Sequence, residues 1–297
     1  MEKKFISIEP QELKVPDLHQ TLLGLVAPRP IAFASTLDRE GNPNLAPFSF
    51  FNVFSSNPPI VIFSPNRSGR TGKNKDTIHN LMDTMEVVIN MVSYDIVQQM
   101  NVAACEYPLA INEFTKSGLT PINSDCVKPF RVKESPAQLE CKVEQIITLG
   151  SQGGAGNLVV CKVLKIHIDE NIIHEKYKID PHKIDLVARM GADFYCRASG
   201  DAVFEVPKPN QKLGIGFDLL PDFLKYHKNL TGNELGQLAN LETLPSEEDI
   251  KNFKNENQEF LHQFKNSEEK IQWAKNQLAL YPNDTYFILK VLMTIKV

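Results

Sequence analysis

The chain has 297 residues, of which 42% are hydrophobic and 23% are charged, and its formal net charge at pH 7 is −4. This composition is typical of a soluble globular protein of one or two domains, and the negative charge argues against nucleic acid as the main partner. The five cysteines are odd in number and contain no CxxC pair, which argues against a disulfide framework or a zinc site and favours a reducing compartment.

The N-terminal sequence and the hydropathy pattern bear on where the protein works. MEKKFISIEPQELKVP has no apolar signal-peptide core. No stretch approaches the ~18 consecutive apolar residues of a transmembrane helix. We therefore expect a cytoplasmic protein with no membrane partner.

The first part of the chain has the pattern of strands joined by tight turns. PIAFASTL at 30–37 is short and apolar, and DREGNPN at 38–44 is rich in turn formers. A strand-like run, LAPFSFFNVFSS at 45–56, is separated from IVIFS at 60–64 by a Pro-Pro break. Three strands separated by turns favour an antiparallel sheet over βαβ units.

A helical pattern follows, with apolar residues at Ile78, Leu81, Met82 and Met85. Asp76 or Thr77 can cap this helix at its N-terminus. The run EVVINMV at 86–92 predicts another strand, and Ser93 is placed to cap a second helix that ends near residue 104. Residues 105–136 have little periodicity and predict a long loop.

A long β-hairpin is predicted next. Polar and apolar residues alternate in AQLECKVEQIITLG at 137–150, which fits a half-buried strand. SQGGAGN at 151–157 reads as the turn, and LVVCKVLKIHID at 158–169 as the returning strand. AVFEV at 202–206 is the last strand candidate.

The character of the sequence changes near residue 208, where PKPNQKLGIG resembles a linker. Helical runs then occupy 218–230, 247–266 and 267–281, with Ser246 before Asp249 and Ser267 before two glutamates as predicted helix starts. We therefore divide the chain into a β-rich domain, 1–207, and a helical C-terminal extension, 208–297.

A basic run, NRSGRTGKNKDTIHN at 66–80, ends where the first predicted helix begins. A helix N-terminus offers unpaired N–H groups and partial positive charge, and nearby lysine or arginine adds charge-assisted hydrogen bonds. The run is therefore a candidate phosphate site, although an ordinary solvated loop could have the same composition. It is neither a P-loop nor a Rossmann turn, since GxxxxGK[ST] and GxGxxG are both absent.

Aromatic and polar residues are mixed in NLAPFSFFNVFSSNPP at 44–59. Four phenylalanines share this run with Asn44, Ser49 and Asn52. Such a strand could line a pocket for a flat heteroaromatic ring. The alternative is an ordinary aromatic core strand.

Motifs for a protein-borne nucleophile or a metal centre are missing. The sequence contains no GxSxG and no HExxH. His167, Asp169 and His174 could approach one another only across a probable turn, and no neighbour in sequence would activate the thiol of Cys105. We predict no catalytic side chain and no metal, and infer that a bound cofactor supplies the chemistry.

Four segments, taken together and in this order, resemble the flavin reductase-like family with the FMN-binding split barrel. They are APRPIAFASTLDREGNPNLAPFSFFNVFSSNPPIVIFS, KDTIHN, SPAQLECKV and VARMGADFYCR, and the similarity covers about residues 20–206. The resemblance implies an α+β fold, mainly β with helices, built on a six-stranded antiparallel Greek-key barrel. It also implies a homodimer with FMN near the subunit interface.

The activity implied by this resemblance is hydride transfer from NAD(P)H to bound FMN and on to an acceptor that the residues do not specify. Two alternatives stay open. The chain could be a flavoredoxin-like electron carrier that does not oxidise NAD(P)H directly, or it could serve another split-barrel role, such as pyridoxamine-phosphate oxidation or a haem function. The stretch LTGNELGQLANLETLP resembles extensions of longer members, and the extension could cap the pocket, widen a dimer interface, select a substrate or simply pack.

The resemblance also implies a set of FMN-binding residues. Those near the phosphate and the ribityl chain are Ser35, Thr36, Arg67, Lys75, Asp76, Thr77 and Asn80. Those along the edge of the isoalloxazine ring are Asn44, Leu45, Ala46, Pro47, Phe48 and Ser49, with Asn52 close by. Two arginines of the PRPI and ARMG elements, Arg29 and Arg189, are also expected near the site, either in the same subunit or across the dimer.

Overall fold

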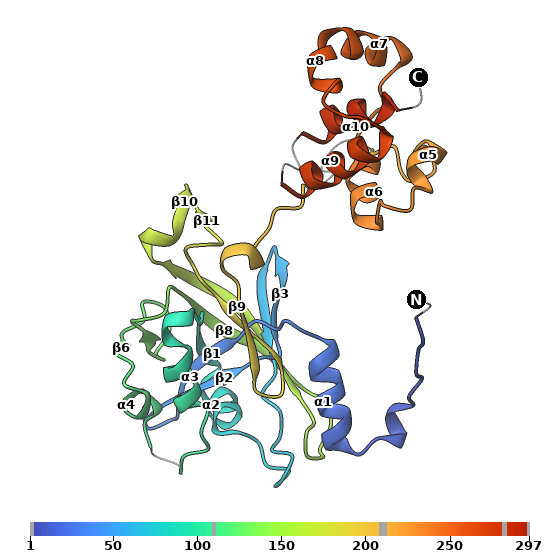
Figure 1. The fold of residues 1–297 in the computed structure, drawn as a ribbon. Coiled ribbons are helices and arrows are strands. Elements are labelled where there is room, and N and C mark those ends of the chain that lie inside the picture. Colours follow the sequence, from blue (N-terminus) through green and yellow to red (C-terminus); the bar gives the residue numbers. More distant parts are fainter. Residues whose placement is uncertain (1–2, 109–110, 208–212, 281–283, 296–297) are drawn as a thin grey trace. The chain divides into compact units, whose positions relative to one another are not determined.

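The computed structural model describes residues 3–108, 111–207, 213–280 and 284–295. The chain divides into two compact units, Met1–Val203 and Phe204–Val297, which appear as ribbons in Figure 1. Residues 208–212 of the predicted linker lie outside the described residues. Among the described residues, no helix is long and apolar enough to span a membrane.

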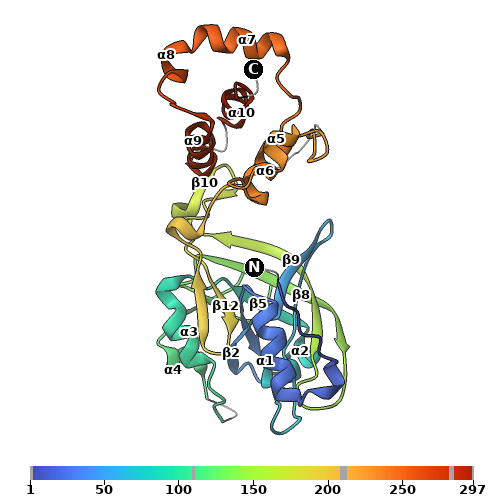
Figure 2. The ribbon, with the colours of Figure 1, turned by 45° about the vertical axis from the view of Figure 1, so that its right-hand side comes forward.

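The first unit is built on a seven-stranded antiparallel sheet with the order β2-β1-β5-β8-β9-β4-β3. Its edge strands β2 and β3 are joined only by Ser49 and Phe50, so the sheet must curl to bring its two edges together at that end (Figure 2). The strands are β1 Ala32–Leu37, β2 Pro43–Phe48, β3 Phe51–Ser56, β4 Pro59–Phe63, β5 Glu86–Asn90, β8 Ala137–Thr148 and β9 Asn157–Ile168.

This open antiparallel barrel agrees with the predicted fold class, but it has seven strands rather than six. The difference arises in the run 45–56, which we predicted as one strand. The run breaks at Ser49 and Phe50, and its two halves pair at opposite edges of the sheet. The predicted hairpin at 137–169 is confirmed by the pairing of β8 with β9.

Apolar residues cover both faces of the sheet. Ala34, on β1, belongs to the cluster inside the barrel, together with Ile78 of helix α2 (Asp76–Thr84). Phe33, also on β1, belongs to a second cluster with residues of α3 (Val97–Ala103) and α4 (Glu113–Ser117). All six residues of β1 are buried for this reason, which explains why its sequence does not alternate.

Two sequence predictions about helices in this unit are corrected by the structure. Neither Asp76 nor Thr77 caps α2, because Lys75 has the extended backbone of the N-cap and Asp76 is already helical. The predicted loop at 105–136 contains α4 and two short strands, β6 Pro121–Ile122 and β7 Arg131–Val132. The side chain of Asn112 caps α4, and Gly118 ends it in the left-handed conformation.

The predicted strand at 202–206 is wrong. Residues Gly200–Ala202 form a 3₁₀ turn, η4, and the described residues 203–207 belong to no strand. The last strands of the first unit are instead the hairpin of β12 (Val187–Gly191) and β13 (Phe194–Arg197). The other elements of this unit are η1 Pro10–Glu12, α1 Val15–Leu25, η2 Tyr94–Ile96, η3 Glu170–Ile172, β10 Ile173–Glu175 and β11 Lys178–Ile179.

The second unit is helical and has its own apolar core. Ser246 starts α7 through a capping box with Asp249, as predicted. The predicted cap at Ser267 is displaced by one residue, because the N–H of Glu269 donates to the side chain of Asn266 at 2.9 Å. The helices are α5 Asp222–Lys225, α6 Gly232–Ala239, α7 Glu247–Glu256, α8 Gln258–Leu261, α9 Ser267–Leu280 and α10 Thr285–Met293.

Candidate functional site

A cleft of about 220 Å³ lies in the first unit where the N-terminus of α2, strand β2 and the end of α3 meet. Four segments that are distant in sequence form its walls, namely 44–48, 68–77, 103–107 and Glu113. The lining includes seven of the residues that the sequence predicted for the cofactor, which are Asn44, Ala46, Pro47, Phe48, Lys75, Asp76 and Thr77.

The N-terminus of α2 provides this cleft with hydrogen-bond donors. The first N–H groups of a helix have no partner within the helix, and the N-cap residue Lys75 makes no side-chain capping bond. Lys73 and Lys75 line the cleft beside these groups. The partial positive charge of the helix end and the two ammonium groups together favour an anion at this point.

A polar network ties the β1–β2 hairpin to α2. Thr77 donates its hydroxyl to the side-chain oxygen of Asn44 at 2.8 Å, and Asn80 donates to the hydroxyl of Thr36 at 3.0 Å. Thr36 and Asn44 face each other across the β1–β2 pair and their side chains are 3.4 Å apart. The network therefore fixes the Asn44 amide in the wall of the cleft.

Glu113 completes this network and was not predicted as a site residue. Its side chain is buried, and it accepts hydrogen bonds from Leu45 N–H at 3.1 Å and from the Asn44 amide at 3.3 Å. Burial raises the pKa of the Glu113 carboxyl, and the nearby charge of Asp76 adds to this effect. Glu113 lies on a five-residue helix inside an aperiodic stretch, so hydrophobic periodicity gave no sign of it.

Glu106 also lines the cleft, and its carboxylate forms an ion pair with Lys75. The hydrogen bond from Lys75 lowers the pKa of Glu106, so this carboxyl is ionised at neutral pH. Arg70 lies 3.5 Å from the same carboxylate. An anion that binds Lys75 must therefore compete with the carboxylate of Glu106.

Several predicted residues lie outside the cleft lining. Ser35 is fully buried on β1, and among the described residues its hydroxyl has no hydrogen-bond partner. Leu45 is buried behind the cleft wall, Ser49 lies in the β2–β3 link, and Asn52 is exposed on β3. Arg67 donates to the carbonyl of Gly72 at 3.2 Å, which holds its own loop closed.

The two arginines that we expected near the site do not line this cleft within one chain. Arg29 is buried, and it donates to the carbonyls of Leu23 and Val26 at the C-terminal end of α1. Its backbone pairs with that of Arg189 on β12. Arg189 lines a different cleft, between the β12–β13 hairpin and α3.

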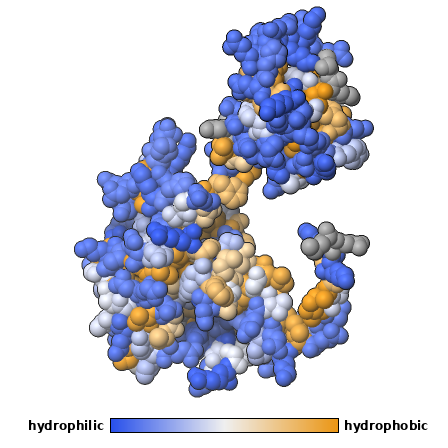
Figure 3. Space-filling model, viewed as in Figure 1, coloured by the Kyte–Doolittle hydropathy of each residue, from blue (hydrophilic) through white to orange (hydrophobic). Residues whose placement is uncertain are grey.

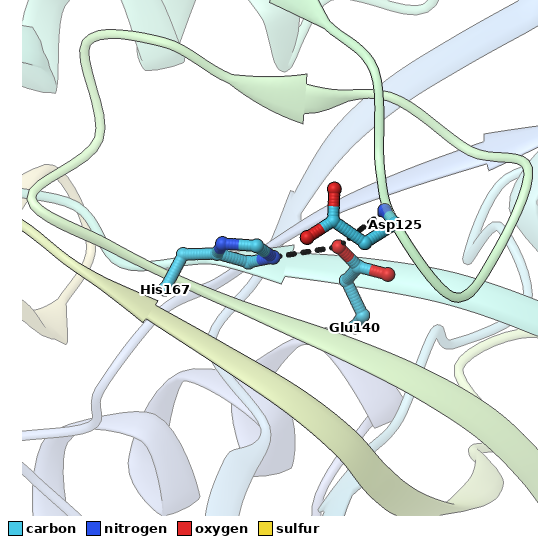
Figure 4. Close-up of side chains that lie close together, drawn as sticks. All are labelled: Asp125, Glu140 and His167. Carbon is cyan, nitrogen blue, oxygen red and sulfur yellow. Dashed lines mark hydrogen bonds and ion pairs between the residues drawn. The ribbon is translucent and has the colours of Figure 1, made fainter.

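The side chains of Asp125, Glu140 and His167 form a cluster whose potential ligand atoms lie within 4.8 Å of one another (Figure 4). The fully buried Glu140 accepts hydrogen bonds from the N–H groups of Asp125 and Cys126, and its carboxylate lies 2.6 Å from the ring of His167. Lys165 bonds Asp125 at 2.5 Å. Because these donors already satisfy the carboxylates, we interpret the cluster as a clamp on the 123–131 loop rather than a metal centre.

His167, Asp169 and His174, which could approach one another only across a probable turn, form no cluster of potential metal ligands in the part of the chain that the structure describes. His167 turns to Glu140, while the side chain of Asp169 accepts a hydrogen bond from the N–H of Asn171. The geometry thus separates a candidate anion-binding cleft beside β2 and α2 from an ion cluster on β8, β9 and the preceding loop.

Comparison with known proteins identifies the family of the chain. A flavin reductase like domain model matches residues 25–181. An uncharacterized protein of Aquifex aeolicus is 37% identical over 190 residues, which cover 64% of this chain and 94% of that relative.

Solved structures are also similar. Nitrilotriacetate monooxygenase component B from Bacillus cereus is 31% identical, with a TM-score of 0.65, over 69% of this chain and 100% of its own. A split-barrel protein from Shewanella frigidimarina is 26% identical, with a TM-score of 0.57, over 67% of this chain and 96% of its own. The chain therefore belongs to the flavin reductase-like family, with the split-barrel fold.

Proposed function

We propose that the protein is an FMN-dependent oxidoreductase that oxidises NAD(P)H and passes the electrons to an acceptor. One observation carries this proposal. The uncapped N-terminus of α2, flanked by Lys73 and Lys75, opens into the same cleft as the β2 wall from Asn44 to Phe48. A helix N-terminus with two lysines and a largely apolar wall in one cleft match the two halves of a flavin nucleotide.

The chemical types of the residues that line the cleft fit FMN. The N–H groups at the start of α2 and the ammonium of Lys75 would hold the phosphate after displacing Glu106. Ala46, Pro47 and Phe48 would lie against the ring, with the Asn44 amide fixed by Thr77 and Glu113. Within the described residues, this is the cleft that combines a helix N-terminus with the predicted ring-binding strand.

Bound flavin would supply the redox chemistry of hydride and electron transfer. The protein then needs to bind, orient and shield the reactants. Tyr107 and residues 103–105 also line the cleft and would limit the access of water. The network through Asn44 and Glu113 would hold the polar edge of the site in one orientation.

The test is anaerobic stopped-flow mixing of the FMN-loaded protein with NADH or NADPH. The proposal predicts loss of the long-wavelength flavin absorbance with at least one nucleotide. If dithionite bleaches the flavin and neither nucleotide does, the protein is an electron carrier, and the oxidation of NAD(P)H is excluded.

A homodimer is part of this proposal. Helix α1 has no buried residue, and apolar side chains on it and on the preceding arm are exposed, including Phe5 at 86% and Leu25 at 75%. Figure 3 shows this apolar surface over α1 and the arm. An isolated amphipathic helix gains most of its stability from packing, so a second copy is a suitable cover. Light scattering should give twice the chain mass, and a monomer mass would contradict the dimer.

A further inference from the structure

A second cleft, of about 370 Å³, lies in the first unit between the β12–β13 hairpin and α3. The hairpin side carries arginine and tyrosine, and the helical side carries amides. The residues used below are Arg189, Tyr195 and Arg197 from the hairpin, Tyr94 from η2, and Gln98 and Asn101 from α3.

Both guanidinium groups of the cleft are held in place. Arg189 lies 4.6 Å from the ring centre of Tyr195 and donates to the carbonyl of Ala192 at 2.6 Å. Arg197 lies 3.9 Å from the ring centre of Tyr94. Stacked arginines lose little freedom when they bind a ligand, and their planar faces can also stack on a base.

The charge of Arg189 is available to a ligand, whereas that of Arg197 is not. Arg197 makes two hydrogen bonds of 2.7 Å to the carboxylate of Asp185. Arg189 has no carboxylate partner in the part of the chain that the structure describes. The acidic residue in the described lining is the exposed Asp193 at the rim.

Arg29 adds a second positive charge behind Arg189. Its side chain is 6% exposed, and its Nε and Nη2 atoms have no hydrogen-bond partner among the described residues. Burial lowers the pKa of Arg29, and the neighbouring charge of Arg189 lowers it further. Two neighbouring guanidinium groups that pair with no carboxylate among the described residues make this part of an acidic protein locally positive.

Helix α3 is a wall of both clefts. Gln98 and Asn101 line the second cleft, while Ala103 and Ala104 line the cleft at α2. Gln98 and Ala104 are separated by about 9 Å along the helix axis at 1.5 Å per residue. Figure 2 shows α3 beside the strands of the hairpin. A ligand with two ends joined by a flexible linker can therefore reach both clefts.

We propose that the second cleft binds the phosphorylated adenosine end of NAD(P)H while the nicotinamide end reaches the cleft at α2. This inference rests on the proposed function. Arg189 pairs with a phosphate, and the adenine stacks on the tyrosine and guanidinium faces. The phosphate at Arg189 is either the 2′-phosphate or the pyrophosphate of the nucleotide. Fragments of the nucleotide that carry only one of these groups distinguish the two cases by their affinities.

The experiment is isothermal titration calorimetry of the full chain with adenosine 2′,5′-bisphosphate and with 5′-ADP. These probes contain no nicotinamide and require no flavin, so binding is measured independently of the redox reaction. Arg189→Gln should weaken binding by roughly tenfold or more, because it removes a charge-assisted contact. Asp193→Asn should strengthen binding by about twofold, because it removes a rim carboxylate from an exposed position.

The outcomes separate this inference from the proposed function. A preference for the bisphosphate identifies the 2′-phosphate, and a preference for 5′-ADP identifies the pyrophosphate, as the group at Arg189. Binding of neither probe, or equal affinity of wild type and a folded Arg189→Gln variant, overturns the inference. If the protein binds a probe tightly but NAD(P)H does not bleach its flavin, the nucleotide cleft stands and the proposed activity is refuted.

Discussion

Replacing Glu106 by Gln should tighten FMN binding, and replacing Lys75 by Ala should weaken it. The side chains of Lys75 and Glu106 are 37% and 55% exposed, and such an ion pair contributes about 0.2–1 kcal/mol. Removing the competing carboxylate should therefore improve FMN affinity by at most about fivefold. Loss of Lys75 removes charge-assisted bonds worth about 1.5–3 kcal/mol, which weakens binding by roughly 10- to 150-fold.

The assay is a fluorescence titration of each apoprotein with FMN at neutral pH and low salt. Riboflavin is the control ligand, because it has the ring but no phosphate. Its affinity should respond weakly to both substitutions. If Glu106→Gln weakens FMN binding as Lys75→Ala does, Glu106 is a ligand and the displacement argument is wrong. If the substitutions change the affinities for riboflavin and FMN equally, the phosphate does not bind at the N-terminus of α2.

Three further predictions concern stability. The fragment 1–207 should fold and retain FMN, because the apolar clusters of the barrel contain no residue of the second unit; an insoluble fragment would show that the two units depend on each other. Since the folded-state pKa of Glu113 is raised, its ionisation lowers stability as pH rises above the ordinary glutamate value of 4.5. Glu113→Gln should remove this loss in urea unfolding, whereas an unchanged pH dependence would contradict the assignment. Glu140→Ala should cost about 2–5 kcal/mol in the same assay, because it leaves buried donors unpaired. The exposed Glu144→Ala on the same strand is its matched control, and equal effects of the two would argue against the clamp.

The parts of the fold with strong local periodicity could be predicted from the sequence. The β8–β9 hairpin alternates along its length, and α2 has its apolar residues at helical spacing, so local chemistry and tertiary packing agree. The break at Ser49 and Phe50 could not be predicted in this way. It arises because a curled sheet must place its two edge strands next to each other, which is a property of the whole barrel.

The same distinction applies to the candidate site. Asn44, Lys75 and Thr77 meet in the cleft because two short segments with clear local patterns, the turn before β2 and the start of α2, position them. Arginine side chains are long, and their directions depend on elements that come from elsewhere in the chain. Arg29 points to the C-terminal carbonyls of α1, a helix that our sequence analysis did not predict.

The absorbance spectrum of the purified protein, followed by titration with FMN, tests the central claim most directly. The account predicts either a flavin spectrum in the isolated protein or saturable uptake of FMN by the apoprotein, with equimolar flavin and chain at saturation. A folded protein that is colourless as isolated and takes up no FMN would contradict it.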